Sequence, residues 1–449
     1  MFKLPPHSTP LRSTVLFAAV AAAGLGAPAL ARAQADGAIT LDEVVRLTLR
    51  HNERALVAEA EAEAAHHRLA RARAFFFPEL TITGAFTRRL NQTVRTVGGS
   101  PVTISRHNAL SAQANLVVPL FDARLFPLYR QAKLEGQSAR LAAAEAKRLL
   151  GYEAADAFLM VLSQEQVTGA ANQRLAFSRE TLAQSRARAQ AGLVSSNDVT
   201  RAELEVATAE RELGTSRASA EIAKLELGFL VASKLEGRLS TPDGLLTEAG
   251  KTSLRQAELL ERGLAARLDI QSGQARVLAA EAAADEPSRR LVPALAGVAQ
   301  YRVTNEQGFS GRVGDGFAGL TATWPLWDGG DRAAESKERR ALAKAEKAAQ
   351  DTRIRSVVIQ IKQALVALEN ARKTQTVAAQ AAEIARRNVE ETGELYRQGL
   401  VRALEVADAN LRLYESEVAL ARERYALALA YLDLRAAVGE SPPGTKENP

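Results

Sequence analysis

The sequence feature that most constrains this chain is a pair of very long helical runs, each ending in a Gly-Leu-Val turn. Gly192 lies 73 positions after Pro119, and Gly399 lies 74 positions after Pro325, with mainly good helix formers between them. Glycine suits the left-handed residue that ends many helices. About 65 helical residues extend roughly 100 Å, whereas the mean globular helix has about 11–12 residues. The chain is therefore predicted to contain two very long helical hairpins.

Each turn leads into a second helix whose apolar residues recur at alternating spacings of three and four, as in a coiled-coil seam. After the first turn the seam comprises Val199, Ala202, Val206, Ala209, Leu213, Ser216, Ala220, Ala223, Leu227 and Leu230. After the second turn it comprises Leu404, Ala407, Leu411, Tyr414, Val418, Ala421, Tyr425, Ala428 and Leu432. The many small residues favour close approach of the helices.

The second half of the chain repeats the plan of the first. Each half has two alternating, strand-like stretches, at 80–87, 110–118, 295–302 and 317–324. A helix precedes each pair of strands, at about 41–74 and 254–285, and prolines end it. The segment Val-Pro-Leu-Phe-Asp at 118–122 corresponds to Trp-Pro-Leu-Trp-Asp at 324–328. This internal repetition predicts two structural repeats.

The N-terminal residues are typical of an export signal. Lys3 and Arg12 precede an apolar stretch at 14–30, and Ala31-Arg32-Ala33 offers a cleavage site with small residues. Glycines and Pro28 in this weakly hydrophobic stretch disfavour a permanent membrane helix. The predicted organisation is a cleaved signal peptide at 1–33, a first repeat at 34–235, a connector at 236–252, a second repeat at 253–440 and a disordered tail at 441–449.

Composition narrows the function classes. The absence of cysteine excludes disulfides, thiolate metal sites and a cysteine nucleophile, and no lipid anchor on an N-terminal cysteine is expected. The formal net charge is +6, but lysine and arginine alternate with acidic residues at helical spacings, as at 335–340. This pattern indicates solvated helix faces, and no nucleic-acid partner is expected.

No motif predicts catalysis, a cofactor or a metal ion. Gly314 begins a GxGxxG pattern, but a strand-like stretch follows it instead of a helix N-terminus that holds phosphate. His66 and His67 are adjacent on a helix and point about 100° apart, which disfavours a shared metal ion. We therefore expect a protein that is not an enzyme and has neither cofactor nor metal.

The four strands raise the question of a membrane. Each is long enough to cross a bilayer when tilted, but four strands cannot close a barrel, and lipid does not tolerate open sheet edges. Several copies must therefore combine their strands if these enter a bilayer. The alternative is a periplasmic adaptor or structural coiled-coil protein without membrane strands. The regular alternation at 110–118, followed by Pro119, speaks against that alternative.

Over essentially its whole mature length, the chain resembles the TolC-like outer-membrane efflux protein family. The resemblance rests on the duplicated plan, the segments beginning at Val118 and Trp324, and the two Gly-Leu-Val turns. It implies a mostly α fold with a small β portion. Duplicated antiparallel helical hairpins and four membrane strands per chain assemble as a trimer, with a 12-stranded β-barrel in the outer membrane and a helical tunnel in the periplasm.

The resemblance also implies a function. The trimer is expected to be a passive exit duct for efflux or type I secretion in a Gram-negative bacterium. Its partners are outer-membrane lipid, a periplasmic adaptor and an inner-membrane transporter that supplies the energy.

The same resemblance assigns a periplasmic gate to residues near the turns. Family members carry a tyrosine three positions before the second glycine and acidic residues six and nine positions after it. Here these are Tyr396, Glu405 and Asp408. Three copies would gather the carboxylates into a cation-selective ring. Asp198 matches the acceptor of the tyrosine hydroxyl. Without the family, these residues fit solvated helix charges and a core tyrosine.

The two turns are also the expected docking sites for the adaptor. Exposed leucine and valine at a turn suit a partner's helical hairpin. A simple helix C-cap with its hydrophobic contact is a compatible interpretation. The residues expected to dock are Gly192, Leu193, Val194, Gly399, Leu400 and Val401.

Overall fold

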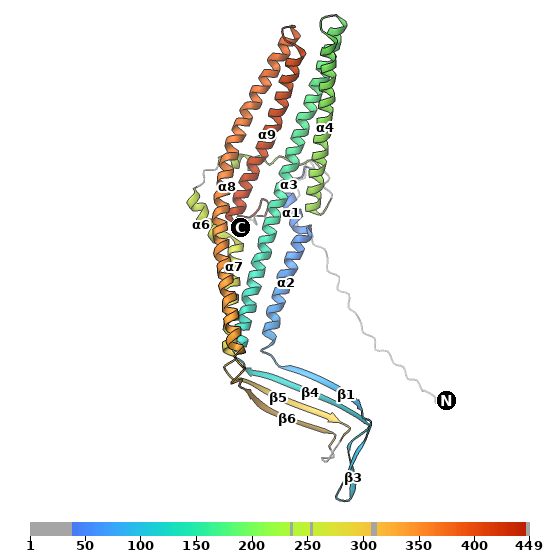
Figure 1. Ribbon diagram of the computed structural model, residues 1–449, viewed down its shortest axis with the longest axis vertical. Helices are drawn as coiled ribbons and strands as arrows, with labels where there is room; N and C mark the ends of the chain where they lie inside the picture. The colour runs from blue at the N-terminus through green and yellow to red at the C-terminus, as the bar shows by residue number, and fades with distance from the viewer. Residues whose placement is uncertain (1–37, 234–236, 252–254, 307–311, 446–449) are drawn as a thin grey trace, which may run out of the picture. The chain divides into compact units, whose positions relative to one another are not determined.

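The computed structural model describes residues 38–233, 237–251, 255–306 and 312–445 (Figure 1). The chain from Ile39 onward forms one compact unit. The predicted signal peptide, residues 1–33, lies outside the described residues. Within the described part, the fold is mostly helical with a small β portion, as predicted.

The elements follow the same order in both halves, with additions. The first half contains α1 (Leu41–His51), α2 (Glu53–Ala74), β1 (Glu79–Arg88), β2 (Thr93–Val97), β3 (Ser100–Ser105), β4 (Asn108–Phe121), α3 (Leu125–Gln190) and α4 (Ser196–Val231). The second half contains α5 (Asp243–Lys251), α6 (Gln256–Ala266), α7 (Leu268–Arg289), β5 (Ala294–Thr304), β6 (Gly314–Thr323), α8 (Asp331–Arg397) and α9 (Ala403–Val438). The long helices α3 and α8 have 66 and 67 residues, and α4 and α9 have 36 each.

Two predicted helices are each broken once. The first breaks at Asn52, whose backbone is extended; its side chain accepts from the Arg54 N–H at 2.9 Å and donates to the Leu230 carbonyl at 2.8 Å. The second breaks at Arg267, also extended, whose guanidinium pairs with Asp269 at 2.8 Å. Asn52 thereby caps the start of α2, whereas the Arg267 side chain makes no cap bond to the start of α7.

Other local predictions also need correction. Between β1 and β4, where only a connection between two strands is predicted, the chain forms a hairpin, β2–β3, around Gly98 and Gly99, which both have positive φ. The connector contains helix α5, and Pro287 lies inside the last turn of α7 instead of ending it.

Residues 441–445 of the C-terminal tail are ordered, contrary to the prediction, whereas residues 446–449 lie outside the described residues. Residues up to 445 are described, and Pro442 is buried close to Gly151. Gly444 lies against the backbone of Asp42, and the Thr445 N–H donates to the Pro442 carbonyl at 3.3 Å. Compact prolines and glycines suit these close contacts.

The main sheet has the strand order β1-β4-β5-β6, and all its pairs are antiparallel. Since paired residues share a face, the register separates two surfaces. One face is mainly apolar and carries Leu80, Ile82, Phe86, Leu110, Leu116, Tyr301, Val303 and Leu320. The other is mainly polar and carries Thr81, Thr83, Thr87, Gln113, Asn115, Gln300, Arg302, Thr321 and Thr323. Both faces are largely uncovered, and β1 and β6 are free edges within the described residues.

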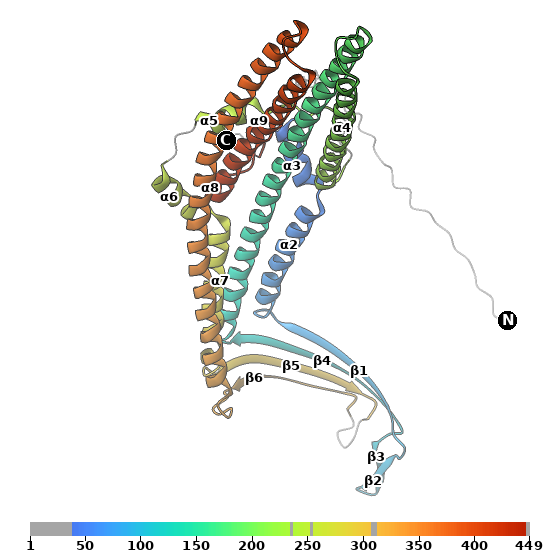
Figure 2. The ribbon, with the colours of Figure 1, turned by 45° about the horizontal axis from the view of Figure 1, so that its top comes forward.

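The helices pack as two antiparallel hairpins, α3 with α4 and α8 with α9 (Figures 1 and 2). The sheet lies at the ends of α2, α3, α7 and α8 that point away from the hairpin turns. The largest core cluster joins α1, α3, α4 and α9 around Val44, Phe158, Leu227 and Leu432. No helix in the described part combines the length and apolarity needed to cross a membrane.

The predicted seam of α4 is confirmed, because its residues from Ala202 to Leu230 include most of the buried positions of that helix. The predicted seam of α9 is confirmed only from Ala421 onward. Nearer the turn, Val406, Ala409 and Leu413 are buried instead, and Leu404 is 55% exposed.

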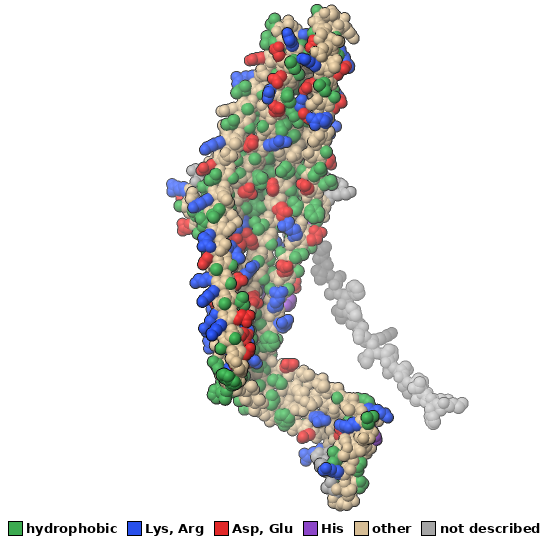
Figure 3. Space-filling view, viewed as in Figure 1, with side chains coloured by type: hydrophobic (Ala, Val, Ile, Leu, Met, Phe, Trp, Pro, Cys, Tyr) green, Lys and Arg blue, Asp and Glu red, His purple; other side chains and the backbone are tan. Residues whose placement is uncertain are grey.

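Charged side chains of both signs are interspersed over the helices, as Figure 3 shows. A hydrophobic patch lies where α8 meets the sheet; in the segment before α8, Trp324, Leu326 and Trp327 are all exposed.

Candidate functional site at the hairpin tips

The two hairpin turns have the same backbone geometry. Gly192 has φ +73° and Gly399 has φ +79°, as the left-handed position requires. In the first turn, the N–H groups of Gly192 and Leu193 donate to the Ala189 and Arg188 carbonyls at 3.0 and 2.9 Å. The second turn repeats these two bonds at the same distances. Both turns are therefore Schellman caps, which satisfy the last carbonyls of α3 and α8.

The leucines of the turns are not used to close them. Leu193 is 74% exposed and Leu400 is 68% exposed, whereas Val194 and Val401 are partly buried. In a Schellman cap the residue directly after the glycine, here leucine, often packs against the preceding helix. Two leucines left open at neighbouring tips offer an apolar surface to a partner.

Tyr396 is buried where the two hairpins meet. Its hydroxyl lies 3.2 Å from the Ser185 hydroxyl, and the two residues are 3% and 0% exposed. The Arg188 guanidinium lies 4.1 Å from the centroid of the tyrosine ring and donates to the Tyr396 carbonyl at 2.6 Å and the Arg397 carbonyl at 3.3 Å. Arg188 on α3 therefore caps the C-terminal end of α8, where a cation is favoured.

The predicted contact between Tyr396 and Asp198 is not present in this arrangement. Asp198 instead forms a capping box with Ser195: its Oδ2 accepts from the Ser195 N–H at 3.3 Å and from the hydroxyl at 3.1 Å. This local box lies in the first turn of α4 and draws Asp198 to its own helix start. Ser185 takes the place of Asp198 beside the tyrosine hydroxyl.

Glu405 and Asp408 lie exposed on the first turns of α9. Asp408 has Arg412 as its nearest cation at 3.7 Å, in a pair whose side chains are both more than 60% exposed. Exposed ion pairs of this kind contribute little to the free energy of folding. Since the two carboxylates are three positions apart on one helix, they point to the same side of α9.

A second link joins the hairpins farther from the tips. Arg174 of α3 is 3% exposed, pairs with Glu205 and Glu212 of α4, and stacks on Tyr414 of α9 at 5.1 Å. Burial alone lowers the pKa of Arg174, but the hydrogen bonds and charges of the two glutamates outweigh it and raise the pKa. Arg174 therefore remains a cation inside the helical bundle.

Sequence reasoning missed Arg188, Ser185 and Arg174. Their partners lie up to about two hundred positions away, so no local periodicity marks them. Arg188 lies four positions before the first glycine, and a cation near a helix end is a usual pattern. That pattern gave no sign that the guanidinium contacts the other hairpin.

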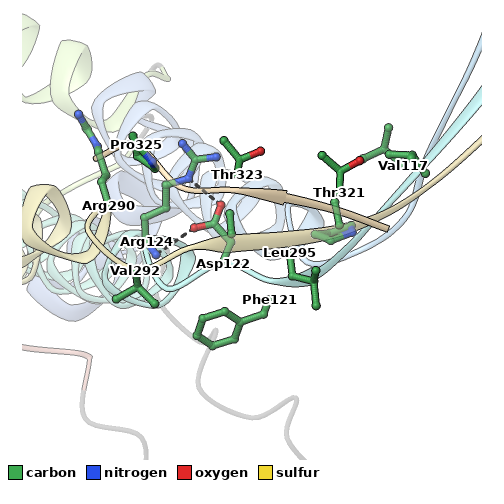
Figure 4. Close-up of a pocket in the computed structure, with 14 residues that line it drawn as sticks. Val117, Phe121, Asp122, Arg124, Arg290, Val292, Leu295, Thr321, Thr323 and Pro325 are labelled. Carbon is green, nitrogen blue, oxygen red and sulfur yellow. Dashed lines mark hydrogen bonds and ion pairs between the residues drawn. The ribbon is translucent and has the colours of Figure 1, made fainter. Parts of the chain in front are cut away.

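A cavity of about 380 Å³ lies at the base of the sheet, on its polar face. Figure 4 shows Thr323 on one side of the sheet, with Phe121 and Leu295 on the other. The ionic pair at its wall is self-contained, because Arg124 donates to Asp122 through Nε at 2.6 Å and through its backbone N–H at 3.1 Å. This pair joins the end of β4 to the start of α3 and so supports the junction.

The family model of the outer membrane efflux protein matches residues 44–233 and 259–440, which together are well over half of the chain. A search of curated proteins finds no match. Among solved structures, the outer membrane protein VceC from Vibrio cholerae is similar, with a TM-score of 0.74 and 18% identity over 89% of this chain and 96% of that one.

Two other channels share the fold. The CmeC outer membrane channel of Campylobacter jejuni has a TM-score of 0.76 at 14% identity, covering 91% of this chain and 87% of its own. The Neisseria gonorrhoeae MtrE outer membrane channel in its open state has a TM-score of 0.75 at 18% identity, covering 91% of both chains. Together with the family match, these findings confirm the resemblance: the chain belongs to the outer membrane efflux protein family.

Proposed function

We propose that this protein is the outer-membrane channel-tunnel of a tripartite efflux or type I secretion system and serves it as a passive exit duct. The observation that carries the proposal is the four-stranded sheet, which has one mainly apolar face, one mainly polar face and two unpaired edges. A sheet of this kind suits a barrel wall with lipid outside and water inside.

One chain cannot complete this wall. Each unpaired N–H or C=O group at the edges costs roughly several kcal/mol in lipid, so each edge needs a strand from another copy. Three copies with four strands each make a 12-stranded barrel. The same symmetry sets the helical hairpins of three chains around one periplasmic tunnel.

The hairpin tips then form the periplasmic entrance. Threefold symmetry brings three copies of Glu405 and Asp408 together, a carboxylate ring that attracts cations. The Arg188 contact with Tyr396 holds the two tips of one chain to each other. Opening requires this contact to loosen and the second hairpin to move relative to the first.

The partners follow from the tips and from the absence of nucleotide-binding motifs in the sequence. Leu193 and Leu400 present the apolar surface to which a periplasmic adaptor docks. An inner-membrane transporter supplies the energy for export. Adaptor binding is coupled to opening because the docking leucines adjoin the turns that carry Arg188 and Tyr396.

The first experiment is the native mass, in detergent, of protein extracted from outer-membrane fractions. A trimer supports the proposal, and a soluble periplasmic monomer or dimer contradicts it. The cysteine-free chain also allows a direct test of the barrel. Cysteines placed on the free edges, at Thr83 of β1 and at positions 318–322 of β6, should give disulfide-linked trimers.

The matched control places cysteines at Asn115 and Gln300, which are register partners on the central strands. This pair should cross-link only within one chain. The proposed closure through these edges is contradicted if the control pair forms its disulfide but none of the β6 cysteine variants forms an intermolecular disulfide.

A further inference from the structure

A pocket of about 220 Å³ lies between the hairpins, within about three helical turns of their tips. Its walls come from α3, from the first turns of α4 and from the first turns of α9. A ligand in this pocket therefore contacts both hairpins of one chain at once.

Part of the wall is apolar and unfilled. Leu204 and Leu404 are 67% and 55% exposed, and Ala202, Ala403 and Ala407 complete the apolar lining. Leu404 belongs to the seam that the sequence predicts, but it does not pack there. Apolar cavities of about 150 Å³ accommodate benzene, so this pocket has room for a small ring or a short alkyl chain.

The buried end of the pocket carries an unpaired acceptor. Asn410 is 7% exposed and lines the pocket, and its Oδ1 has no hydrogen-bond partner among the described residues. Buried polar atoms without partners are rare in native proteins and call for a ligand or an ordered water. Asn410 therefore calls for a hydrogen-bond donor.

The other polar groups nearby are also acceptors. The hydroxyls of Ser178 and Thr181 already donate to α3 carbonyls at 3.0 Å, so their oxygens can only accept. Asp198 uses Oδ2 in its capping box, so its Oδ1 can accept a further hydrogen bond, and Glu205 is a carboxylate paired with Arg174. Arg201 is the one exception in the lining, and its side chain is exposed to solvent.

From this acceptor-rich lining we infer that the pocket binds a small organic ammonium ion with an apolar body. The ammonium group donates to the Asn410 side chain and to the Asp198 carboxylate, and the apolar body lies against Leu404 and Ala407. Charge-assisted bonds of this kind are stronger than neutral ones. The bound ligand bridges α4 and α9 and favours the present arrangement of the tips. Binding itself does not depend on the proposed channel function; only the effect on the tips does.

The test titrates phenethylammonium chloride into the full-length protein in detergent, with calorimetry as the readout. One saturable site per chain is expected. Asn410→Leu and Asp198→Asn should each weaken binding about 10-fold. The second variant keeps a side-chain oxygen for the capping box. Ala407→Phe, which fills the pocket, should abolish binding.

Two controls make the result specific. Asn388→Leu, at an exposed asparagine on α8, should leave the affinity unchanged. Hydrocinnamate, a carboxylate of similar size, should bind at least about 10-fold more weakly than the ammonium ion.

The inference is overturned if wild-type protein shows no saturable binding up to about 10 mM, or if hydrocinnamate binds equally well. It is also overturned if Asn410→Leu and Ala407→Phe bind as the wild type does. The native mass of each variant verifies its assembly. If the wild-type protein binds the ammonium ion but is not a trimer, only the channel proposal is contradicted.

Discussion

The two hairpin tips share one backbone turn but differ in how the next helix begins. After both glycines the chain runs three residues to an N-cap, and an acidic residue stands three positions after that cap. In the first hairpin the cap is Ser195, and Asp198 closes a capping box with it. In the second hairpin the cap is Arg402, which makes no side-chain cap bond, and Glu405 stays exposed.

Because of this difference, the first tip is stabilised from within its own hairpin, whereas the second tip depends on a contact from the first hairpin. Ser195 and Asp198 satisfy the start of α4 from within the first hairpin. The second tip lacks such a box, and the end of α8 is held by Arg188 from the first hairpin. Glu405 of the second tip is not used in a cap, and Asp408 makes only an exposed ion pair with Arg412. If the tips form the gate that we propose, opening releases the dependent second tip while the first tip keeps its shape.

The largest expected effect follows removal of Arg188. Arg188→Ala deletes the ring contact and two hydrogen bonds to carbonyls, together about 2 kcal/mol at a half-buried site. Amide exchange at the second tip, from Tyr396 to Glu405, should rise by about 30-fold. The first tip should change much less. Arg186→Ala is the matched control, because the Arg186 pair with Glu203 is exposed. Equal acceleration of both tips contradicts a one-sided dependence.

Removal of a carboxylate from the second tip should alter ion block. In the trimer that we propose, Asp408→Ala takes three charges from the carboxylate ring, so block of single-channel current by divalent cations should weaken by about 10-fold. Glu415→Ala, about two turns farther along α9, is the control. Unchanged block in Asp408→Ala removes this residue from the gate.

Loss of the capping box should act on the first tip alone. Asp198→Ala removes the acceptor of the Ser195 N–H and should cost about 1 kcal/mol locally. Exchange in the first turn of α4 should then rise by about 5-fold, with α9 unaffected. If α9 responds equally, the first tip is not self-contained.

The smallest effect comes from giving the second tip the missing cap. Arg402→Ser creates the pattern of a capping box with Glu405 and should stabilise the start of α9 by about 0.5–1 kcal/mol. Exchange there should slow by about 2-fold to 5-fold, and cation block should weaken because Glu405 is engaged. Arg402→Ala separates the new cap from loss of the arginine; equal results for the two substitutions contradict the capping explanation.

Much of the fold follows from local signals. The turn glycines, the helix formers between Pro119 and Gly192, and the alternation at 110–118 determine conformation within a few residues of themselves, and the predicted elements appear there. The breaks at Asn52 and Arg267 were missed because each depends on side-chain contacts beyond the helical pattern. The same holds for the tail, where Pro442 is buried close to Gly151 of α3, nearly three hundred positions earlier in the chain.

The candidate site likewise has features that the sequence predicts and features that it does not. The sequence by itself determined the two Schellman turns, the acidic residues that follow them and the family, because these depend on short spacings and on repetition. Only the tertiary structure decided that Tyr396 meets Ser185 and Arg188, that Asp198 turns to its own helix, and that Asn410 lies beside an unfilled pocket. The physical reason is that these contacts join helices distant in sequence, and small changes in helix rotation select which side chains face one another across the hairpins.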